Sequence, residues 1–573
     1  MSVITVENLK YRYPHTKKLA LDGLSFSVEK GEFIGIIGEN GAGKSTLSQA
    51  IMGLVPQFYK GAYGGKVLVD GIEAGKTPVA QLCGHVGLVF QNPFNQLSGA
   101  KDNVYEEVAF GMQNLGIPAE EMKTRVEEAL KLLDIWQYRD RNPFDLSGGQ
   151  MQRVAIASVL VMRPDVMILD EPTSQLDPEG SDEVFRAVET LTNSGITILM
   201  IEQKIEKMAA YCDRILLLHK GKQIAFDTPQ KVFSMPDLNE YGIQAPAFTR
   251  ICRAKQVTLP DGTYPVTVDE AAGVLHGTVI GKSGKVPAEA TGFKEAGQSS
   301  ERSAADEEQF RIEKLDFSYL ADVPVLQNLN MTLDKRPTAI IGQNGAGKTT
   351  LVKLLKGLLK PVSGHIYFQG EDISGKTVAM LAGNVGYVFQ NPDDQIFKYN
   401  VMDEILFGPL NIGMDEAQAK KEAMRALELT GLVGKENENP YDLELYERKM
   451  TAIASVLAMD TDVLILDEPT IAQDWKGRQI IGGIIRSLSE RGKLVIAILH
   501  DMDFVAENFE RVIVMAHGQV LADGSAKEVF AQEEVLKQAR LQKPYVMQLC
   551  EALGYEKAYL TVEEILKDQE REA

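Results

Sequence analysis

The sequence of 573 residues lacks any apolar run close to the roughly 20 residues that a membrane-spanning helix needs. Its apolar runs, such as Val166–Leu169 and Ile196–Ile201, have the length of buried strands. The sequence does not open with a basic segment followed by an apolar one, so we expect no secretory signal and a cytoplasmic location.

The sequence also has few cysteines and fewer basic than acidic side chains. The chain has 60 basic and 80 acidic side chains and therefore a net charge of −20. This negative charge opposes binding to nucleic acid phosphates or anionic lipid. We therefore expect no nucleic acid partner. The cysteines are far apart and form no CxxC pair, which predicts isolated buried thiols in a reducing compartment. They are Cys83, Cys212, Cys252 and Cys550.

The most informative feature that is present is an internal repeat. Three segments recur in the same order: GENGAGKST at Gly38–Thr46 as GQNGAGKTT at Gly342–Thr350, VGLVFQNP at Val86–Pro93 as VGYVFQNP at Val385–Pro392, and ILDEPT at Ile168–Thr173 as the same letters at Ile465–Thr470. The period is too long for a solenoid and indicates two whole homologous domains.

We place the first domain at residues 1–250 and the second at residues 309–545. The joining segment, residues 251–308, is rich in Gly, Ala and Ser and predicts a flexible linker, with a short strand and helix around Val266–Leu275. Residues 546–573 are predicted to form a helical tail.

Both copies contain a glycine-rich loop that fits G-x-x-x-x-G-K-[ST], placed after an apolar strand and before a helix. Glycines let the backbone N–H groups turn inward toward phosphate, the helix N-terminus adds partial positive charge, and the lysine neutralises the β- and γ-phosphates. We assign to ATP the residues Gly38, Asn40, Gly41, Gly43, Lys44, Ser45, Thr46, Gly342, Asn344, Gly345, Gly347, Lys348, Thr349 and Thr350.

An apolar strand that ends in Asp-Glu follows each loop. Asp170 and Asp467 can hold Mg²⁺ through water, and the hydroxyls of Ser45 and Thr349 can ligate it directly. The next residues, Glu171 and Glu468, can polarise the water that attacks phosphate.

These residues, with Leu146-Ser-Gly-Gly-Gln150, resemble the ABC ATPases over both domains. The resemblance implies an α/β fold in which each P-loop domain has a RecA-like parallel-sheet core, an antiparallel β subdomain and a helical signature subdomain. It also implies that Ser147, Gly148, Gly149 and Gln150 contact ATP, that Gln91 and Gln390 form glutamine loops near the metal and the reaction, and that Tyr13 and Tyr319 stack on adenine.

A narrower resemblance is to the energy-coupling factor branch of vitamin and metal-ion importers, through QNPFNQL and QNPDDQIF and the segments VYEEVAFGMQNLGI and VMDEILFGPLNIGM. It implies a transmembrane coupling protein and a small substrate-binding membrane protein as partners, at the cytoplasmic face of the membrane. Asn92–Leu97 and Asn391–Phe397 are the candidate docking surface, and plain contacts within each domain are the alternative.

The two copies differ at two positions of the expected chemistry. A gap-free alignment places Leu443-Glu-Leu-Tyr-Glu447 opposite LSGGQ, and Gln203 stands opposite the switch residue His500. The family pairs its domains head to tail, with each ATP between one domain's loop and the other's signature. Both departures then fall at the first domain's loop, which predicts one competent and one degenerate ATP site. Glu468, His500 and Gln390 serve the competent site and Glu171 the degenerate one.

Two other functions stay open at the level of sequence. A tandem ABC protein without membrane spans could act on ribosomes or DNA, although the acidic composition argues against this. A non-catalytic nucleotide sensor is disfavoured by the intact set around Lys348, Glu468 and His500.

Overall fold

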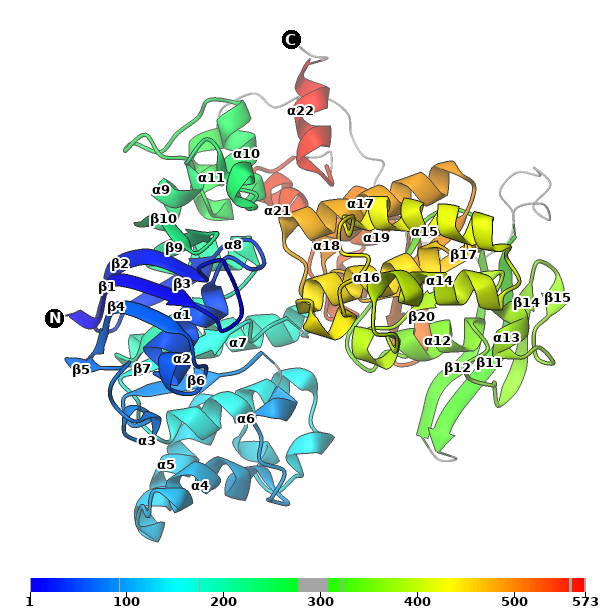
Figure 1. Ribbon diagram of the computed structural model, residues 1–573. Coiled ribbons are helices and arrows are strands. Elements are labelled where there is room, and N and C mark those ends of the chain that lie inside the picture. The colour runs from blue at the N-terminus through cyan, green and yellow to red at the C-terminus, as the bar shows by residue number, and fades with distance from the viewer. Residues whose placement is uncertain are drawn as a thin grey trace. The chain divides into compact units, whose positions relative to one another are not determined.

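The computed structural model describes residues 2–91, 93–174, 176–276, 308–320, 323–555 and 559–570. The chain divides into two compact units, Met1–His276 and Gly277–Ala573, called unit 1 and unit 2 below (Figure 1). Each unit contains one copy of the sequence repeat. None of the helices in the described ranges has both the length and the apolar composition needed to cross a bilayer.

Unit 1 contains two sheets and a group of helices. The four-stranded antiparallel sheet has the order β2-β1-β4-β5, and the six-stranded sheet has the order β10-β9-β3-β8-β7-β6, parallel except for β10. The strands are β1 Ser2–Arg12, β2 Leu21–Glu29, β3 Phe33–Ile37, β4 Ala62–Val69, β5 Ile72–Glu73, β6 Val86–Val89, β7 Val166–Asp170, β8 Thr197–Ile201, β9 Arg214–His219 and β10 Lys222–Asp227. The main helices are α1 Lys44–Ile51, α4 Val104–Asn114, α5 Ala119–Leu132, α6 Gly148–Leu160 and α7 Pro178–Asn193.

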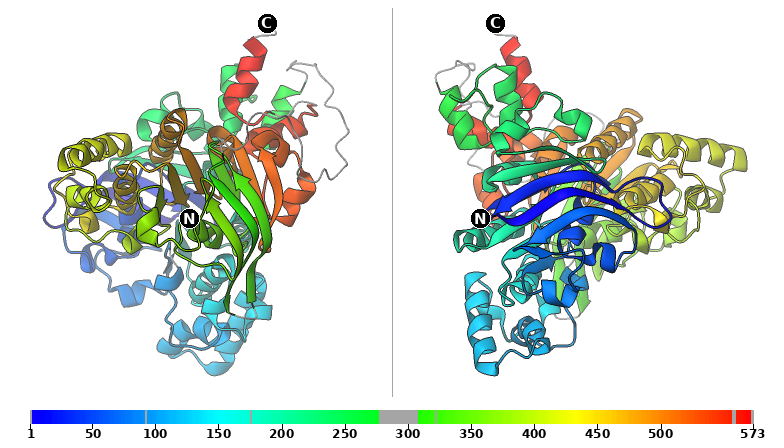
Figure 2. Two further views of the ribbon diagram at one scale, coloured as in Figure 1. Left: turned by 90° about the vertical axis from the view of Figure 1, so that its right-hand side faces the viewer. Right: turned by 60° about the vertical axis from the view of Figure 1, so that its left-hand side comes forward.

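Unit 2 repeats this plan with the sheet orders β12-β11-β14-β15 and β16-β17-β18-β13-β19-β20. Its strands are β11 Phe310–Leu320, β12 Val323–Leu333, β13 Thr338–Ile341, β14 Ser363–Phe368, β15 Glu371–Asp372, β16 Val385–Val388, β17 Val463–Asp467, β18 Leu494–Ile498, β19 Arg511–Ala516 and β20 Gln519–Ser525. Its main helices are α12 Lys348–Leu355, α14 Val401–Asn411, α15 Glu416–Thr430, α16 Leu445–Leu457 and α17 Trp475–Glu490. Figure 2 shows the long antiparallel strands of both units.

The parallel strands form because they are apolar on both faces, as strands covered on both sides must be. In β3, Phe33 and Ile37 belong to one core cluster, whereas Ile34 and Ile36 belong to the cluster on the opposite face. The same strands end at one edge of the sheet, and this edge gathers the loops that carry polar side chains. The predicted α/β class, with a parallel core, an antiparallel subdomain and a helical region, is confirmed.

The first unit extends beyond the predicted boundary at residue 250. Helices α10 Ala247–Ala254 and α11 Val268–Leu275 lie within it, so the segment predicted as a linker over residues 251–308 is folded up to residue 276. Val266 is buried in the unit 1 core, and Thr267 and Glu270 form a capping box at the start of α11. Residues 277–307 lie outside the described residues.

The predicted C-terminal tail is helical where it is described, in α21 Tyr545–Ala552 and α22 Val562–Glu570. Met547 and Leu560 belong to the unit 2 core, and the backbone N–H of Tyr545 donates to Asp503 at 2.9 Å. The tail is therefore a packed part of the second unit.

The extended boundary predicts different stabilities for two fragments. Fragment 1–276 should fold, whereas fragment 1–250 should lose roughly 10 °C in its thermal midpoint because it exposes the apolar surface that α10 and α11 cover. Circular dichroism melts of the two fragments measure this difference. Equal midpoints would show that residues 251–276 do not stabilise unit 1.

Candidate nucleotide-binding sites

The glycine-rich loop of unit 1 connects β3 to α1 and requires glycine at two positions. Gly38 has a φ of 154°, and a Cβ there would lie 2.3 Å from the carbonyl oxygen of Leu218. Gly43, the residue before α1, has a φ of 99°, and its Cβ would lie 2.5 Å from the carbonyl oxygen of Ala20. Only glycine fits both the space and the backbone angle. The loop can therefore curl tightly around a phosphate at the N-terminus of α1.

The loop of unit 2 between β13 and α12 has the same constraints. Gly342 has a φ of 149°, and a Cβ would lie 2.1 Å from the carbonyl oxygen of Met515. Gly347, with a φ of 94°, would bring a Cβ within 2.7 Å of Leu326. The two loops thus share one backbone geometry, as their sequences predict.

The loop lysines are buried and point into their own loops. Lys44 Nζ donates to the carbonyl oxygens of Gly38 and Glu39, both at 2.9 Å. Lys348 Nζ donates to the equivalent carbonyls of Gly342 and Gln343 at 2.8 and 2.9 Å. An ammonium in this position can exchange some of these bonds for phosphate oxygens without leaving the loop.

Each loop places a hydroxyl beside the aspartate that ends the central strand. Ser45 hydrogen-bonds Asp170 in unit 1, and Thr349 Oγ1 donates to Asp467 Oδ1 at 3.4 Å in unit 2. Burial raises the pKa of both aspartates above the ordinary range, so a cation between hydroxyl and carboxylate would stabilise the ionised form. A hydroxyl next to a carboxylate is the oxygen donor set that Mg²⁺ prefers, and these residues fit that ion.

A residue that the sequence did not single out also contacts the unit 2 aspartate. Tyr387, in β16, donates its hydroxyl to Asp467 Oδ2 at 2.8 Å. Burial, and then the neighbouring Asp467 carboxylate, raise the pKa of this phenol well above its usual range. Unit 1 has Leu88 at the aligned position. The aspartate is therefore held more firmly in unit 2.

The glutamate of unit 2 lies between three polar side chains. Gln390 Nε2 donates to Glu468 Oε2 at 2.9 Å, His500 Nε2 lies 3.1 Å from Oε1, and Lys449 Nζ donates to the main-chain oxygen of Glu468 at 2.6 Å. Burial alone would raise the pKa of Glu468, but His500, Lys348 and Lys449 outweigh it and hold the pKa below its ordinary value. The carboxylate is kept ionised.

The glutamate of unit 1 has equivalent hydrogen bonds at its carboxylate, but from amides only. Gln91 Nε2 donates to Glu171 Oε2 at 2.8 Å, and Gln203 Nε2 donates to Oε1 at 2.9 Å and to Asn40 Oδ1 at 3.3 Å. Burial raises the pKa of Glu171 to about 7 despite the lysine of its loop. Two basic side chains of unit 2 have amides in their place in unit 1: Gln203 stands for His500, and Gln152 stands for Lys449. In both units the glutamine amide N–H₂ binds the glutamate, which leaves its Oε1 as the atom available to a cation.

The two predicted adenine tyrosines make equivalent contacts but differ in exposure: Tyr13 is half-buried, and the ring of Tyr319 lies edge-on to Phe317 with centroids 4.9 Å apart. Tyr319 is 58% exposed and its hydroxyl lies 3.3 Å from Thr350 Oγ1, so its ring is open to stacking. Tyr13 bonds Thr46 and Gln49 at 3.1 and 3.0 Å, and its ring lies edge-on to Tyr11 with centroids 4.9 Å apart.

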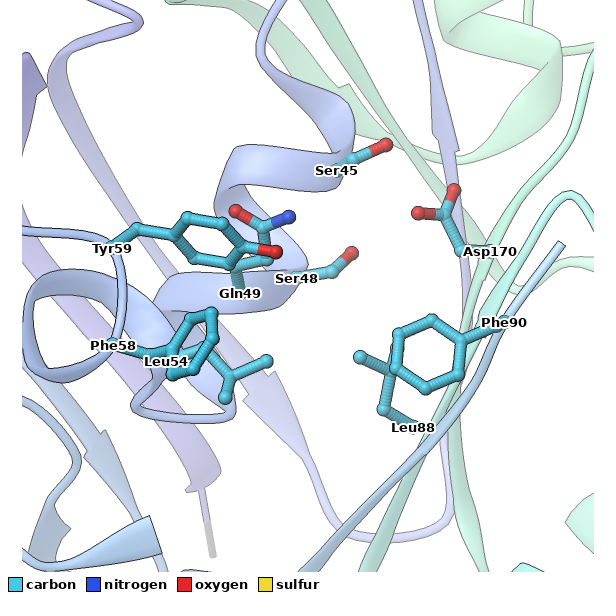
Figure 3. Close-up of a pocket in the computed structure, with 9 residues that line it drawn as sticks. All are labelled: Ser45, Ser48, Gln49, Leu54, Phe58, Tyr59, Leu88, Phe90 and Asp170. Carbon is cyan, nitrogen blue, oxygen red and sulfur yellow. The ribbon is translucent and has the colours of Figure 1, made fainter. Parts of the chain in front are cut away.

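A pocket of about 230 Å³ adjoins the hydroxyl–carboxylate pair of unit 1 (Figure 3). Phe58 and Tyr59 stand on one side and Leu88 and Phe90 on the other, as Figure 3 shows. Phe58 and Tyr59 belong to a segment after α1 that is longer in unit 1 than in unit 2. The sequence did not predict this pocket because the walls come from distant segments.

The signature segments begin α6 and α16 at equivalent places. In unit 1, Gln150 N donates to Ser147 Oγ at 3.3 Å and Ser147 N to Gln150 Oε1 at 3.2 Å, while Gly148 and Gly149 keep the first turn free of side chains. A serine cap and two glycines leave a helix N-terminus that an anion can approach.

In unit 2 the same first turn is filled by side chains. Glu447 accepts from Glu444 N at 3.2 Å and from the Tyr446 hydroxyl at 3.1 Å, and it pairs with the Lys435 ammonium. Tyr446 occupies the position of Gly149. The acidic residues of this segment therefore cap α16 and bind Lys435. Side chains surround the N–H groups of this turn, so a phosphate cannot approach them as it could in unit 1.

The predicted docking surface divides into buried and exposed parts. Gln96 and Gln395 bond α6 and α16 through main-chain oxygens at 2.9 and 2.8 Å, so they hold each unit together, and Leu97 and Ile396 are buried. The exposed side chains nearby are aromatic or apolar: Phe90, Phe94, Leu115 and Phe144 in unit 1, and Phe397, Tyr399, Phe407, Leu410 and Tyr441 in unit 2. Asn92 lies outside the described residues.

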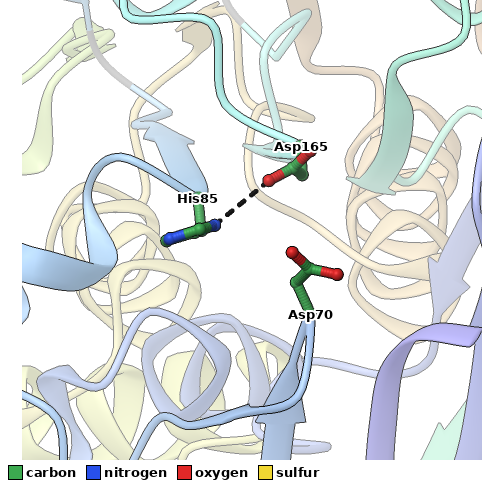
Figure 4. Close-up of side chains that lie close together, drawn as sticks. All are labelled: Asp70, His85 and Asp165. Atoms are coloured by element: carbon green, nitrogen blue, oxygen red, sulfur yellow. Dashed lines mark hydrogen bonds and ion pairs between the residues drawn. The ribbon is translucent and has the colours of Figure 1, made fainter.

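One further cluster of ionisable groups lies at the N-terminal end of β6, whereas the glutamine loop follows the C-terminal end of this strand (Figure 4). The ligand atoms of Asp70, His85 and Asp165 lie within 4.8 Å of one another, and their side chains point together. His85 Nδ1 is 3.1 Å from Asp165 Oδ2, and Lys30 Nζ is 3.7 Å from Oδ1. These ion pairs account for the Asp165 carboxylate without a metal.

Comparisons with known proteins agree with the geometry. The sequence profile described as ABC transporter matches residues 21–174 and 326–471. A putative ABC transporter ATP-binding protein of Caldanaerobacter subterraneus subsp. tengcongensis is 37% identical over 576 residues, which cover 99% of each chain. One from Methanosarcina mazei is 38% identical over 550 residues, which cover 95% of this chain and 92% of that one.

Among solved structures, cbiO1 from Clostridium perfringens, described as part of the ABC transporter complex cbiONQ, is 35% identical. The match covers 43% of this chain and 99% of that chain, with a TM-score of 0.37.

The glycine geometry predicts unequal effects of two substitutions in the unit 2 loop. Gly342→Ala combines a steric clash with an unfavourable φ, so it should weaken ATP binding at this loop by about 100-fold. Gly345→Ala has open space around its Cβ and a φ of 80°, so it should cost about tenfold or less. Titration with a fluorescent ATP analogue, in a chain whose unit 1 loop carries Lys44→Ala, measures both. Equal losses would contradict the steric explanation.

Proposed function

Because the chain belongs to the ABC transporter family and carries its ATPase domain twice, we propose that it hydrolyses ATP to power a membrane importer of the energy-coupling factor type. The observation that carries the proposal is the complete set of polar groups around Glu468 in unit 2, beside a glycine loop that fits phosphate. The importer class rests on the segments after the two glutamine loops, and the protein would lie at the cytoplasmic face of the membrane.

Hydrolysis at unit 2 follows from the positions of its side chains. Lys348 and the loop N–H groups bind the β- and γ-phosphates, and Thr349 and Asp467 would hold Mg²⁺, which neutralises charge between the phosphates. Glu468 accepts a proton from water while the water oxygen bonds the γ-phosphorus. The bond from that phosphorus to the bridging oxygen breaks with its electrons on ADP, and the proton passes to the departing phosphate.

His500 and Gln390 orient Glu468 for this step. Each binds a different carboxylate oxygen, so the carboxylate cannot rotate away from the water. The low pKa of Glu468 means that the group is ready to accept a proton at neutral pH.

The two ATP sites should differ if the units pair head to tail as in the family. The unit 2 loop would face Ser147–Gln150, which offers a serine hydroxyl and a bare helix N-terminus. The unit 1 loop would face Glu444–Glu447, where Tyr446 fills the glycine position. A carboxylate 4 Å from a phosphate charge costs about 4 kcal/mol at an effective dielectric near 20. We infer that the unit 1 site binds nucleotide and turns over slowly.

The membrane partners would dock on the exposed aromatic side chains beside the glutamine loops. Phe94 stacks on Phe144 with centroids 5.8 Å apart, and Lys398 lies over both Phe397 and Phe407. Clustered, exposed aromatic rings are typical of protein interfaces. The alternative, work on ribosomes or DNA, needs a basic surface that the net charge of −20 does not favour.

Unequal sites predict unequal effects of the two glutamate substitutions. In the assembled complex, Glu468→Gln should lower ATPase activity by at least about 100-fold because the general base is lost. Glu171→Gln should leave more than about half of the activity, since this site contributes little turnover. Steady-state phosphate release measures both variants. Equal losses of ATPase activity in the two variants would contradict the proposed difference between the two sites.

The importer assignment predicts a membrane partner. The tagged chain, purified in mild detergent from its own membranes, should carry a multispanning protein in stoichiometric amount, identified by mass spectrometry. Phe397→Asp should reduce its recovery severalfold because it places a charge in the apolar contact. Val362→Asp is the matched control, since Val362 is exposed and its N–H bonds Asp316 of β11, in the antiparallel sheet of unit 2. Recovery of ribosomes or DNA in place of a membrane protein would favour the alternative.

A further inference from the structure

A buried lysine lies beneath the unit 2 glutamate. Lys449, in α16, is only 4% exposed, and its Nζ donates to the main-chain oxygen of Glu468 at 2.6 Å. An ammonium removed from water costs several kcal/mol unless charges of opposite sign compensate it. Here the carboxylates of Glu468 and Asp467 provide that compensation, while burial still lowers the pKa of Lys449 to about 8.

The group that Lys449 holds is a strained part of the backbone. Glu468 has a φ of 50°, a left-handed conformation that costs a non-glycine residue about 1–3 kcal/mol. Its carbonyl oxygen also receives the N–H of Ile471, but at 3.5 Å. In unit 1 the corresponding oxygen of Glu171, at a φ of 47°, receives Ser174 N at 3.2 Å. In unit 2 the bond from Lys449 is therefore the shorter of the two that this oxygen accepts, and it adds to the longer main-chain contact in fixing the turn.

Unit 1 provides an internal comparison for this lysine. The gap-free alignment of α6 with α16 places Gln152 opposite Lys449. Gln152 is 1% exposed, and its Nε2 has no hydrogen-bond partner within the described part of the chain. Because unit 1 forms the same helix and the same left-handed turn with glutamine at this place, this backbone conformation can form without a lysine. The differences at Gln152/Lys449 and Gln203/His500 both place a basic side chain next to the unit 2 glutamate where unit 1 has an amide.

We propose that Lys449 is a positioning residue for ATP hydrolysis at the unit 2 site, where it fixes the main chain of Glu468 and supplies a buried positive charge to the active carboxylate. The inference rests on the proposed assignment of hydrolysis to Glu468. The hydrogen bond of the lysine goes to the main-chain oxygen of Glu468. Its removal should therefore change the rate of the chemical step and leave nucleotide affinity intact.

The test compares Lys449→Gln and Lys449→Met with the matched variant Gln152→Met in the purified membrane complex. Both Lys449 variants should lower kcat about tenfold, because a small misplacement of the general base is costly, while KM for ATP stays within about twofold. Gln152→Met should keep kcat within about twofold. Lys449→Gln carries the residue that unit 1 accommodates at this place, so it retains the fold if the methionine variant does not.

Two outcomes overturn the inference. If both Lys449 variants keep kcat within twofold of the unchanged complex, the lysine does not position the glutamate. If KM rises as much as kcat falls, its role is structural. Glu468→Gln, measured in the same series, separates these results from a failure of the proposed function. If that variant retains activity, the assignment of hydrolysis to unit 2 is wrong, whatever Lys449 does.

Discussion

Burying a carboxylate at the end of an apolar strand raises the free energy of the folded state. In each unit, polar side chains from several loops converge on this carboxylate and offset that increase. Glu171 and Glu468 follow strands β7 and β17, and both adopt a left-handed backbone conformation that only surrounding contacts can maintain. Each is held by a glutamine from the loop after the neighbouring strand and by the residue after β8 or β18. The parallel sheet brings these loops together because its strands end at one edge, next to the glycine loop.

The two units surround the equivalent glutamates with side chains of different charge. In unit 2, the hydrogen bond from His500 and the nearby lysines hold the pKa of Glu468 below its ordinary value, whereas burial raises the pKa of Glu171, which lies between amides, to about 7. Several of the differences between the two copies lie around this one glutamate. The altered signature of unit 2 is internally satisfied, since Glu447 caps its own helix and pairs with Lys435.

The phosphate loops, the acidic strand ends, the glutamines and the altered signature could be predicted because each chemical role needs a few residue types at fixed spacing. Tyr387 and Lys449 could not, since each acts on a residue tens of positions away and looks like ordinary packing in the sequence. The first domain was predicted to end at residue 250 because the joining segment as a whole is rich in Gly, Ala and Ser. The packing of Val266 and the capping box of α11 show that residues up to 276 belong to unit 1. The predicted docking segments contained both internal and exposed side chains, which sequence alone does not separate.

The central claim is that one of two bound ATP molecules is hydrolysed quickly and the other is retained. The most direct measurement is to load the membrane complex with radiolabelled ATP, start the reaction with Mg²⁺ and quench it after a single turnover, then count ATP and ADP bound per chain. We expect one ADP per chain to form in a fast phase and one ATP per chain to remain bound. Two ADP per chain formed at the same rate would contradict it.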